Sequence, residues 1–179
     1  MAYYEDVKSW IFGFIVGLLV LPVFAYIYLA SGMAPVATAA HPLPLERYVT
    51  HKALDAVIDK NAPKTAAIQP TEANLLAGVP LYEHHCAVCH GLPDRAKTSI
   101  AKGEFPAPPQ LFKGKGVTDD PPGETFWKVK YGIRLTGMPG FEASLNDEQM
   151  WQISQLLATE KLPDSVTQAL RKAAESSRP

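Results

Sequence analysis

The strongest constraint on this chain lies in residues 82–94, YEHHCAVCHGLPD, which hold both of its cysteines and three of its five histidines. Thr71 is a predicted N-cap of a helix that continues through this stretch. On such a helix the thiols of Cys86 and Cys89, three positions apart, share a face, and His90 follows directly. A disulfide across so short a spacing would not staple a fold usefully, so a disulfide framework does not explain the pair. The spacing instead indicates one ligand that engages both thiols and an imidazole.

Cys-x-x-Cys-His is the pattern of c-type haem attachment, in which two thiols add to the two vinyl groups of one haem and the imidazole reaches the iron. Three alternatives stay open here. Zinc usually takes four N/S ligands in separated pairs, whereas the chain has no second cysteine pair. A thioredoxin-like redox pair needs a strand–helix–strand setting, of which the sequence shows no sign. Two ordinary core cysteines are the third alternative.

A methionine downstream supports the haem interpretation. A haem that carries electrons needs a sixth ligand, commonly a thioether sulfur. Met138 lies in the loop YGIRLTGMPGF, between a glycine and a proline that favour a turn, and it is the predicted second axial ligand after His90. Met150 falls in a helical pattern and is predicted to be a core residue. The alternatives are a surface Met138 without a role, or a bis-histidine haem that uses the remote His41 or His51.

A second constraint is the apolar run of residues 11–32, IFGFIVGLLVLPVFAYIYLASG, which contains no charged residue. At about 1.5 Å per residue, a helix of this length crosses a hydrocarbon core of about 30 Å. A cleaved signal peptide is the alternative, with the small residues 37–40 as its cleavage site. The run is longer than the core of about 7–15 residues usual in such peptides. We therefore predict an uncleaved single-pass anchor.

The charges near this run predict its orientation. Lys8 precedes the run and the next basic residue is Arg47, so the positive-inside rule places the N-terminus in the cytoplasm. The predicted organisation is then a short cytoplasmic N-terminus at 1–10, a transmembrane helix at 11–32, an Ala/Pro-rich tether at 33–70 with an amphipathic helix at about 45–62, a haem domain at 71–160, and a polar C-terminal helix and tail at 161–179. The 45–62 helix either packs its apolar stripe on the haem domain or docks a partner subunit or the membrane surface. The stripe consists of Leu45, Tyr48, Val49, Leu54, Val57 and Ile58.

The region 71–160 resembles a class I monohaem cytochrome c domain of the membrane-anchored bacterial type. The resemblance is carried by four segments: GVPLYEHHCAVCHG, PAPPQL, ETFWKVKYGIRLTGMPGF and LNDEQMWQISQLLA. It implies an all-α fold, a single covalently attached haem c, and a haem domain on the periplasmic side of a bacterial inner membrane. In this family, the last helix crosses the first.

The resemblance also implies roles for particular residues. The carbonyl of Pro109 would accept a hydrogen bond from the ligating His90, Leu111 would pack on the haem, and the Trp127 indole would reach a propionate. Gly78 would let the last helix approach closely. Many relatives carry an aromatic residue opposite that glycine, where this chain has Leu156, so we expect Trp151 to supply the aromatic packing one turn earlier.

With both axial positions filled by protein and no accompanying acid–base or nucleophile constellation, the predicted function is single-electron transfer, not catalysis. Redox proteins would be the donor and acceptor. The formal net charge of −1 gives no indication of nucleic acid. The alternatives are an integral haem subunit of a larger respiratory or photosynthetic complex, and a haem gas sensor. Basic residues before the methionine loop are predicted to meet an acidic partner, while the acidic turn at Asp119, Asp120 and Glu124 is interpreted as a solvated loop; the basic residues are Lys113, Lys115, Lys128, Lys130 and Arg134.

Overall fold

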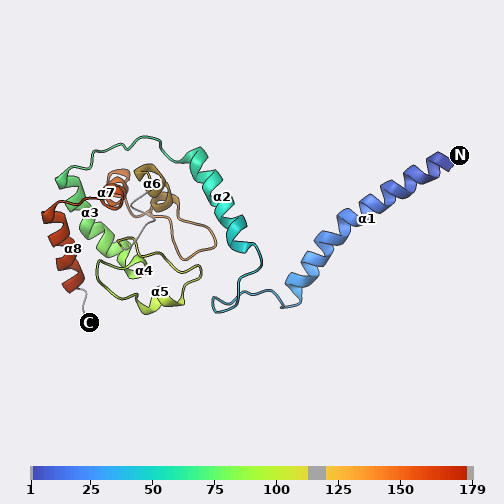
Figure 1. The fold of residues 1–179 in the computed structure, drawn as a ribbon, viewed down its shortest axis with the longest axis horizontal. Coiled ribbons are helices and arrows are strands. Elements are labelled where there is room, and N and C mark those ends of the chain that lie inside the picture. The colour runs from blue at the N-terminus through green and yellow to red at the C-terminus, as the bar shows by residue number, and fades with distance from the viewer. Residues whose placement is uncertain (1, 113–119, 177–179) are drawn as a thin grey trace. The chain divides into compact units, whose positions relative to one another are not determined.

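The structure is a computed structural model that describes residues 2–112 and 120–176, with side chains from residue 7 onward. The chain divides into two units, Met1–Leu43 and Pro44–Pro179. Every regular element within the described ranges is an α-helix, which confirms the predicted all-α class (Figure 1). The helices are α1 (Ala2–Ala30), α2 (Glu46–Asn61), α3 (Glu72–His85), α4 (Ala87–His90), α5 (Ser99–Gly103), α6 (Pro122–Tyr131), α7 (Asp147–Ala158) and α8 (Asp164–Ser176).

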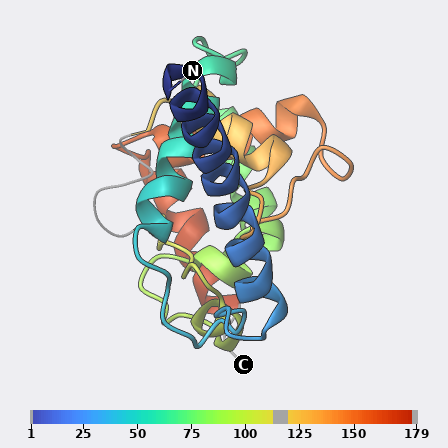
Figure 2. The same cartoon turned by 90° about the vertical axis from the view of Figure 1, so that its right-hand side faces the viewer.

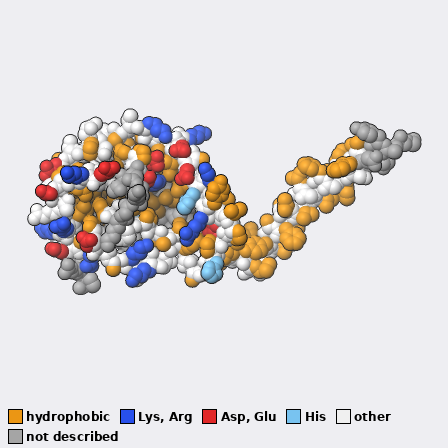
Figure 3. Space-filling view, viewed as in Figure 1, with side chains coloured by type: hydrophobic (Ala, Val, Ile, Leu, Met, Phe, Trp, Pro, Cys, Tyr) orange, Lys and Arg blue, Asp and Glu red, His pale blue; other side chains and the backbone are white. Residues whose placement is uncertain are grey.

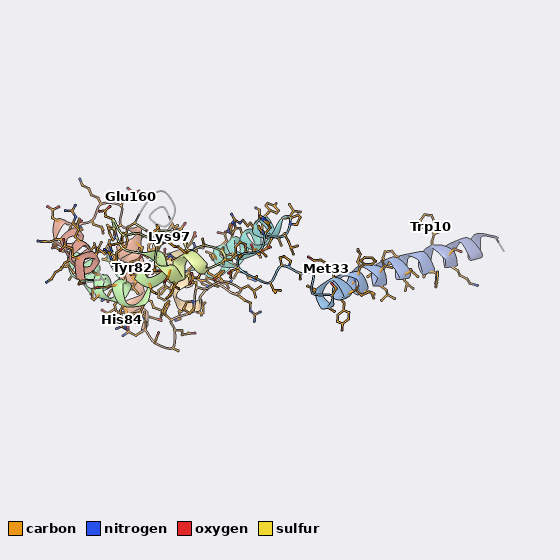
Figure 4. The ribbon with its side chains drawn as sticks, turned by 90° about the horizontal axis from the view of Figure 1, so that it is seen from below. Trp10, Met33, Tyr82, His84, Lys97 and Glu160 are labelled. Atoms are coloured by element: carbon orange, nitrogen blue, oxygen red, sulfur yellow. The ribbon has the colours of Figure 1, made fainter. Side chains whose placement is uncertain are left out.

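The first unit contains α1, a candidate membrane span. Val7–Ala30 forms 24 helical residues that are long and apolar enough to cross a bilayer. Its large apolar side chains are exposed along the helix (Figure 3). Trp10 lies toward its N-terminal end and Met33 just beyond its C-terminal end (Figure 4). Pro22 lies inside the helix without ending it.

The second unit is built around the crossing of α3 and α7. Thr71 caps α3, because its hydroxyl accepts a hydrogen bond from the Asn74 amide at 3.3 Å. A Cβ placed on Gly78 would lie 2.6 Å from the backbone oxygen of Gln152 and 3.3 Å from Cβ of Leu156. Only a glycine permits this contact between the two backbones, so the structure places Gly78 at the crossing, as the sequence predicts.

Helices α6 and α8 complete the core on two sides of this pair. The Trp151 ring on α7 stacks on the Phe126 ring of α6, with centroids 4.2 Å apart and an interplanar angle of 13°. The indole therefore supplies aromatic packing that joins α7 to α6, whereas the atoms nearest to a Cβ at Gly78 belong to Gln152 and Leu156. Helix α8 packs on α3 through a buried apolar face that includes Val166 and Leu170 (Figures 1 and 2).

Helix α2 belongs to the second unit and packs on the rest of it through a narrow apolar stripe. Ile58 is buried, and Leu54 lines the central cavity described below. The predicted stripe is too wide, however, since its other members, among them Tyr48, Val49 and Val57, are exposed. A Cβ on Gly123 would clash with the carbonyl oxygen of Pro63, so the chain that leaves α2 lies directly on the start of α6.

Candidate functional site

The first half of the site lies where α3 gives way to α4. Cys86 ends α3 with φ −118° and ψ −34°, and α4 begins at the next residue. The predicted continuous helix through the cysteine pair is therefore broken at Cys86. Both cysteines are free thiols. Burial raises the pKa of the Cys86 thiol to about 12. Burial, helped by a hydrogen bond to Glu104, raises the pKa of the Cys89 thiol to about 11.

These raised pKa values keep both thiols protonated near neutral pH. A disulfide oxidoreductase needs the opposite, a thiol whose pKa is lowered toward or below neutrality so that the thiolate can attack. The environment of Cys86 and Cys89 therefore disfavours the thioredoxin-like alternative.

Within the part of the chain that the structure describes, no group of three or more His, Cys, Asp or Glu side chains has the geometry of a metal site.

His90, at the end of α4, is held by the segment that follows α5. Its Nδ1 lies 2.9 Å from the carbonyl oxygen of Pro109. A carbonyl only accepts, so Nδ1 carries the proton and Nε2 keeps its lone pair. Burial lowers the pKa of the imidazole, although the hydrogen bond to Pro109 partly opposes this effect. The Gln110 amide also donates to the His90 carbonyl at 3.0 Å, so both the ring and the backbone of His90 are fixed.

Tyr82, which lies inside the helical domain (Figure 4), holds the backbone that follows His90. Its buried hydroxyl donates to the Gly91 carbonyl at 2.8 Å. Gly91 has φ 75°, and a Cβ there would meet the Gln110 side chain at 2.5 Å. The turn after His90 thus depends on glycine both for its left-handed backbone and for the approach of Gln110.

Met138 lies in the second half of the site, a loop between α6 and α7. The Met138 amide donates to Thr136 Oγ1 at 3.1 Å, and the Met138 carbonyl accepts from the Ile133 amide at 3.2 Å. The loop folds back on Gly132, where φ is 69° and a Cβ would meet the Gly140 amide nitrogen at 2.5 Å. Met138 is half-buried against the core. Met150 is 1% exposed within α7, which confirms its predicted place in the core.

One cavity of about 250 Å³ brings these two halves together. It is lined by six of the seven residues that the sequence nominates: Cys86, Cys89, His90, Pro109, Leu111 and Met138. Most of the remaining lining is apolar, with Ile153 and Leu157 of α7 at its base. Paired thiols, a fixed imidazole and a thioether therefore converge on one largely apolar cavity.

Trp127 is the nominated residue that does not line the cavity. Its ring packs on Tyr131 of the same helix, with centroids 5.4 Å apart. Thr125, two residues earlier on α6, lines the cavity instead. Thr125 is 4% exposed, and its Oγ1 is buried without a hydrogen-bond partner. Such an orphaned hydroxyl is costly unless a ligand satisfies it, so it fits a polar group of a molecule held in this cavity.

Sequence reasoning missed further lining residues. His85 lines the cavity and packs edge-on against Phe141, with ring centroids 5.7 Å apart. Leu54 reaches it from α2, and Glu104 from the end of α5. No sequence pattern marks Glu104, because it belongs to no motif and lies fourteen residues beyond His90.

Two of the basic residues named before the methionine loop form ion pairs within the chain. Lys128 pairs at 2.8 Å with Asp120, which lines the cavity and keeps 29% of its side chain exposed. Lys130 pairs with Asp147 at 2.8 Å, while Arg134 is exposed. Lys113, Lys115 and Asp119 lie outside the described residues.

Comparison with known proteins matches one family. The family model described as cytochrome C oxidase, cbb3-type, subunit III matches residues 73–157. This range runs from the start of α3 to the end of α7 and so contains every lining residue named above except Leu54. No curated protein and no solved structure matches the chain.

Proposed function

Because residues 73–157 form a domain of the cytochrome c family, we propose that this chain is a membrane-anchored monohaem cytochrome. It would pass single electrons between redox proteins on the periplasmic side of a bacterial inner membrane. The observation that carries the proposal is the convergence of a fixed imidazole, two thiols and a thioether on one cavity.

The residues of the cavity fit a covalently held haem. Cys86 and Cys89 would form the two thioethers, and His90 Nε2 and the Met138 sulfur would be the axial ligands. The orphaned Thr125 hydroxyl matches the carboxylates that a haem carries at its polar end. When bound, the haem iron supplies the chemistry of electron transfer by alternating between its ferric and ferrous states.

The chain's own residues would set the conditions for that exchange. Pro109 fixes the orientation of the His90 ring and raises the basicity of its free nitrogen. A methionine sulfur as the opposite ligand raises the reduction potential. The apolar lining, including Leu111, Ile153 and Leu157, would leave little room for water beside the bound haem, so that little solvent would reorganise when the charge of the centre changes.

The membrane placement rests on α1 and on the charges beside it. Val7–Ala30 would anchor the chain. Lys8 precedes the span, which favours a cytoplasmic N-terminus. Cytochrome domains of this type receive their haem outside the bacterial cytoplasm, so the same orientation follows from the attachment motif.

The direct test of an electron carrier measures how many electrons each chain releases and whether an added ligand can reach the haem iron. The purified full-length chain in detergent is reduced and mixed rapidly with a one-electron oxidant. We expect one electron to be released per chain and carbon monoxide not to bind the reduced form at neutral pH. Rapid carbon monoxide binding by the unaltered chain would favour a sensor or peroxidase and contradict the proposal.

A second candidate is a subunit of a larger oxidase-type complex. Two observations favour it: the description of the matching family model, and the apolar residues Tyr48, Val49 and Val57 that α2 leaves exposed. Mild detergent extraction followed by size measurement separates the candidates. A lone carrier would migrate as a single 19.5 kDa chain plus its detergent belt, whereas a subunit would co-migrate with other haem proteins.

A further inference from the structure

We propose that Glu104 places a negative charge in the cofactor cavity with no positive partner among the described residues, and that this charge lowers the reduction potential of the bound haem. The inference rests on the proposed function, since it assumes that the cavity holds a haem. It concerns a residue that belongs to none of the motifs of the sequence and that the family resemblance does not assign.

The position of Glu104 is defined by contacts on two sides. Its Oε1 accepts a hydrogen bond from the Cys89 thiol, with Sγ and Oε1 3.1 Å apart. A Cβ on Gly137 would lie 2.9 Å from its carboxyl carbon, so the carboxylate packs on the residue before Met138. Glu104 therefore lies between the attachment segment and the methionine loop, on the wall of the cavity.

The charge of Glu104 differs from the other charges of the cavity wall. Asp120 and Lys128 also line the cavity, but they neutralise each other at 2.8 Å. No lysine or arginine among the described residues forms an ion pair with Glu104.

Attachment of the cofactor would remove the one hydrogen-bond donor that Glu104 has among the described residues. The Cys89 S–H adds across the carbon–carbon double bond of a vinyl group: a C–S bond forms, the S–H and π bonds break, and the hydrogen goes to the other vinyl carbon. The addition needs no external oxidant or reductant. A thioether has no S–H, so the donor to Glu104 disappears when the bond forms.

The Glu104 carboxylate, without its Cys89 donor, would then change the equilibrium between the ferric and ferrous states. A half-buried negative charge beside the site stabilises the ferric state, which carries one more positive charge than the ferrous state. Solvent screening is incomplete at this position because Glu104 is only partly exposed. The direction of the effect is therefore fixed: neutralising Glu104 must favour reduction.

The test compares Glu104→Gln with Glu148→Gln in the full-length haem-loaded chain. Glu148 is an exposed residue of α7 that does not line the cavity, so its substitution removes the same charge elsewhere. Redox titration should show that Glu104→Gln increases the equilibrium constant for reduction at least threefold, which is about 28 mV for a one-electron couple at 59 mV per tenfold. Glu104→Asp, which keeps the charge, should stay nearer to the unaltered chain.

The readouts separate this inference from the proposed function. Absence of covalent haem in the unaltered chain would refute the proposed function itself. A loaded Glu104→Gln chain whose potential moves no further than that of Glu148→Gln would refute the role of Glu104 alone. Glu104→Ala gives a second neutral variant and should shift the potential in the same direction. If neither neutral variant accumulates with haem, Glu104 serves assembly and the proposal is wrong.

Discussion

The Nδ1 atom of His90 lies 2.9 Å from the carbonyl oxygen of Pro109. These two residues are nineteen positions apart, and the hydrogen bond joins α4 to the segment after α5. It directs the lone pair of His90 to Nε2 and restrains the ring. His85 also lines the cavity, but its ring contacts Phe141 instead of a backbone acceptor.

This difference predicts unequal effects of removing the two imidazoles. His90→Ala should abolish the low-spin c-type spectrum, because the iron loses the ligand that the chain holds in place. His85→Ala should leave that spectrum intact. Absorption spectra of both variants, expressed and purified in parallel, make the comparison. Equal loss of the spectrum in both would mean that His90 has no special role.

Two methionines allow a similar contrast. Met138→Ala should remove the sulfur–iron absorption of the oxidised form and open the site to carbon monoxide, because Met138 lines the cavity. Met150→Ala should keep both properties and instead lower the free energy of unfolding by about 2–5 kcal/mol, as for a fully buried core residue. Spectra and urea unfolding of each variant test this, and a spectral change in Met150→Ala alone would reverse the assignment.

Thr125 offers a test of the polar end of the cavity. If its orphaned hydroxyl binds a carboxylate of the cofactor, Thr125→Val should destabilise the loaded protein by about 1.5–3 kcal/mol. An unused hydroxyl predicts the reverse, because valine would remove a buried polar group that has no partner. Trp127→Phe is the matched control and should leave the cofactor environment unchanged, since Trp127 does not line the cavity. Thermal unfolding followed by haem absorbance distinguishes the outcomes.

The crossing of α3 and α7 should tolerate no side chain at position 78. Gly78→Ala would push a Cβ to within 2.6 Å of a backbone oxygen, and overpacking of this kind costs about 1–3 kcal/mol. Gly103→Ala is the control, because a Cβ there meets nothing within 4 Å. Urea unfolding should show a lower midpoint for Gly78→Ala only. Equal midpoints in the two variants would contradict the packing at this crossing.

Tyr82 should make the protein sensitive to alkali. Burial raises the pKa of its hydroxyl well above the ordinary value of about 10. Above about pH 10 the unfolded chain loses the phenolic proton while the folded chain keeps it. This contribution to the free energy of unfolding is therefore complete below about pH 10 and falls as the pH rises further, by about 1.4 kcal/mol per pH unit. Tyr82→Phe should be less stable by about 1 kcal/mol at neutral pH but should lack this component of the alkaline decline. Unfolding curves measured from pH 8 to about pH 12 test the difference.

The sequence predicted the elements whose signals are local. The Thr71 cap, the long apolar helix and the burial of Met150 each follow from a pattern visible along the chain. The ligand-type residues could be nominated for the same reason, since their spacing and their flanking glycines and prolines are visible in the sequence. The close approach at Gly78 follows instead from the family resemblance.

The residues that were missed depend on tertiary contacts. Glu104 reaches the cavity only because the segment after α5 folds back on the methionine loop. The sequence points to Trp127 and not to Thr125, because it shows the composition of α6 but not which face of the helix meets the cavity. The width of the α2 stripe was overestimated because helical spacing gives a face, whereas the extent of contact depends on the shape of the surface below it.

The central claim is that this cavity holds one haem c with His90 and Met138 as axial ligands. The most direct measurement is the absorption spectrum of the purified full-length chain, oxidised and reduced, with a denaturing pyridine assay of the same sample. The predicted result is one c-type haem per chain and a weak red sulfur-to-iron band in the oxidised form. Covalent haem without that band would contradict the assignment of Met138, and absence of haem would contradict the claim as a whole.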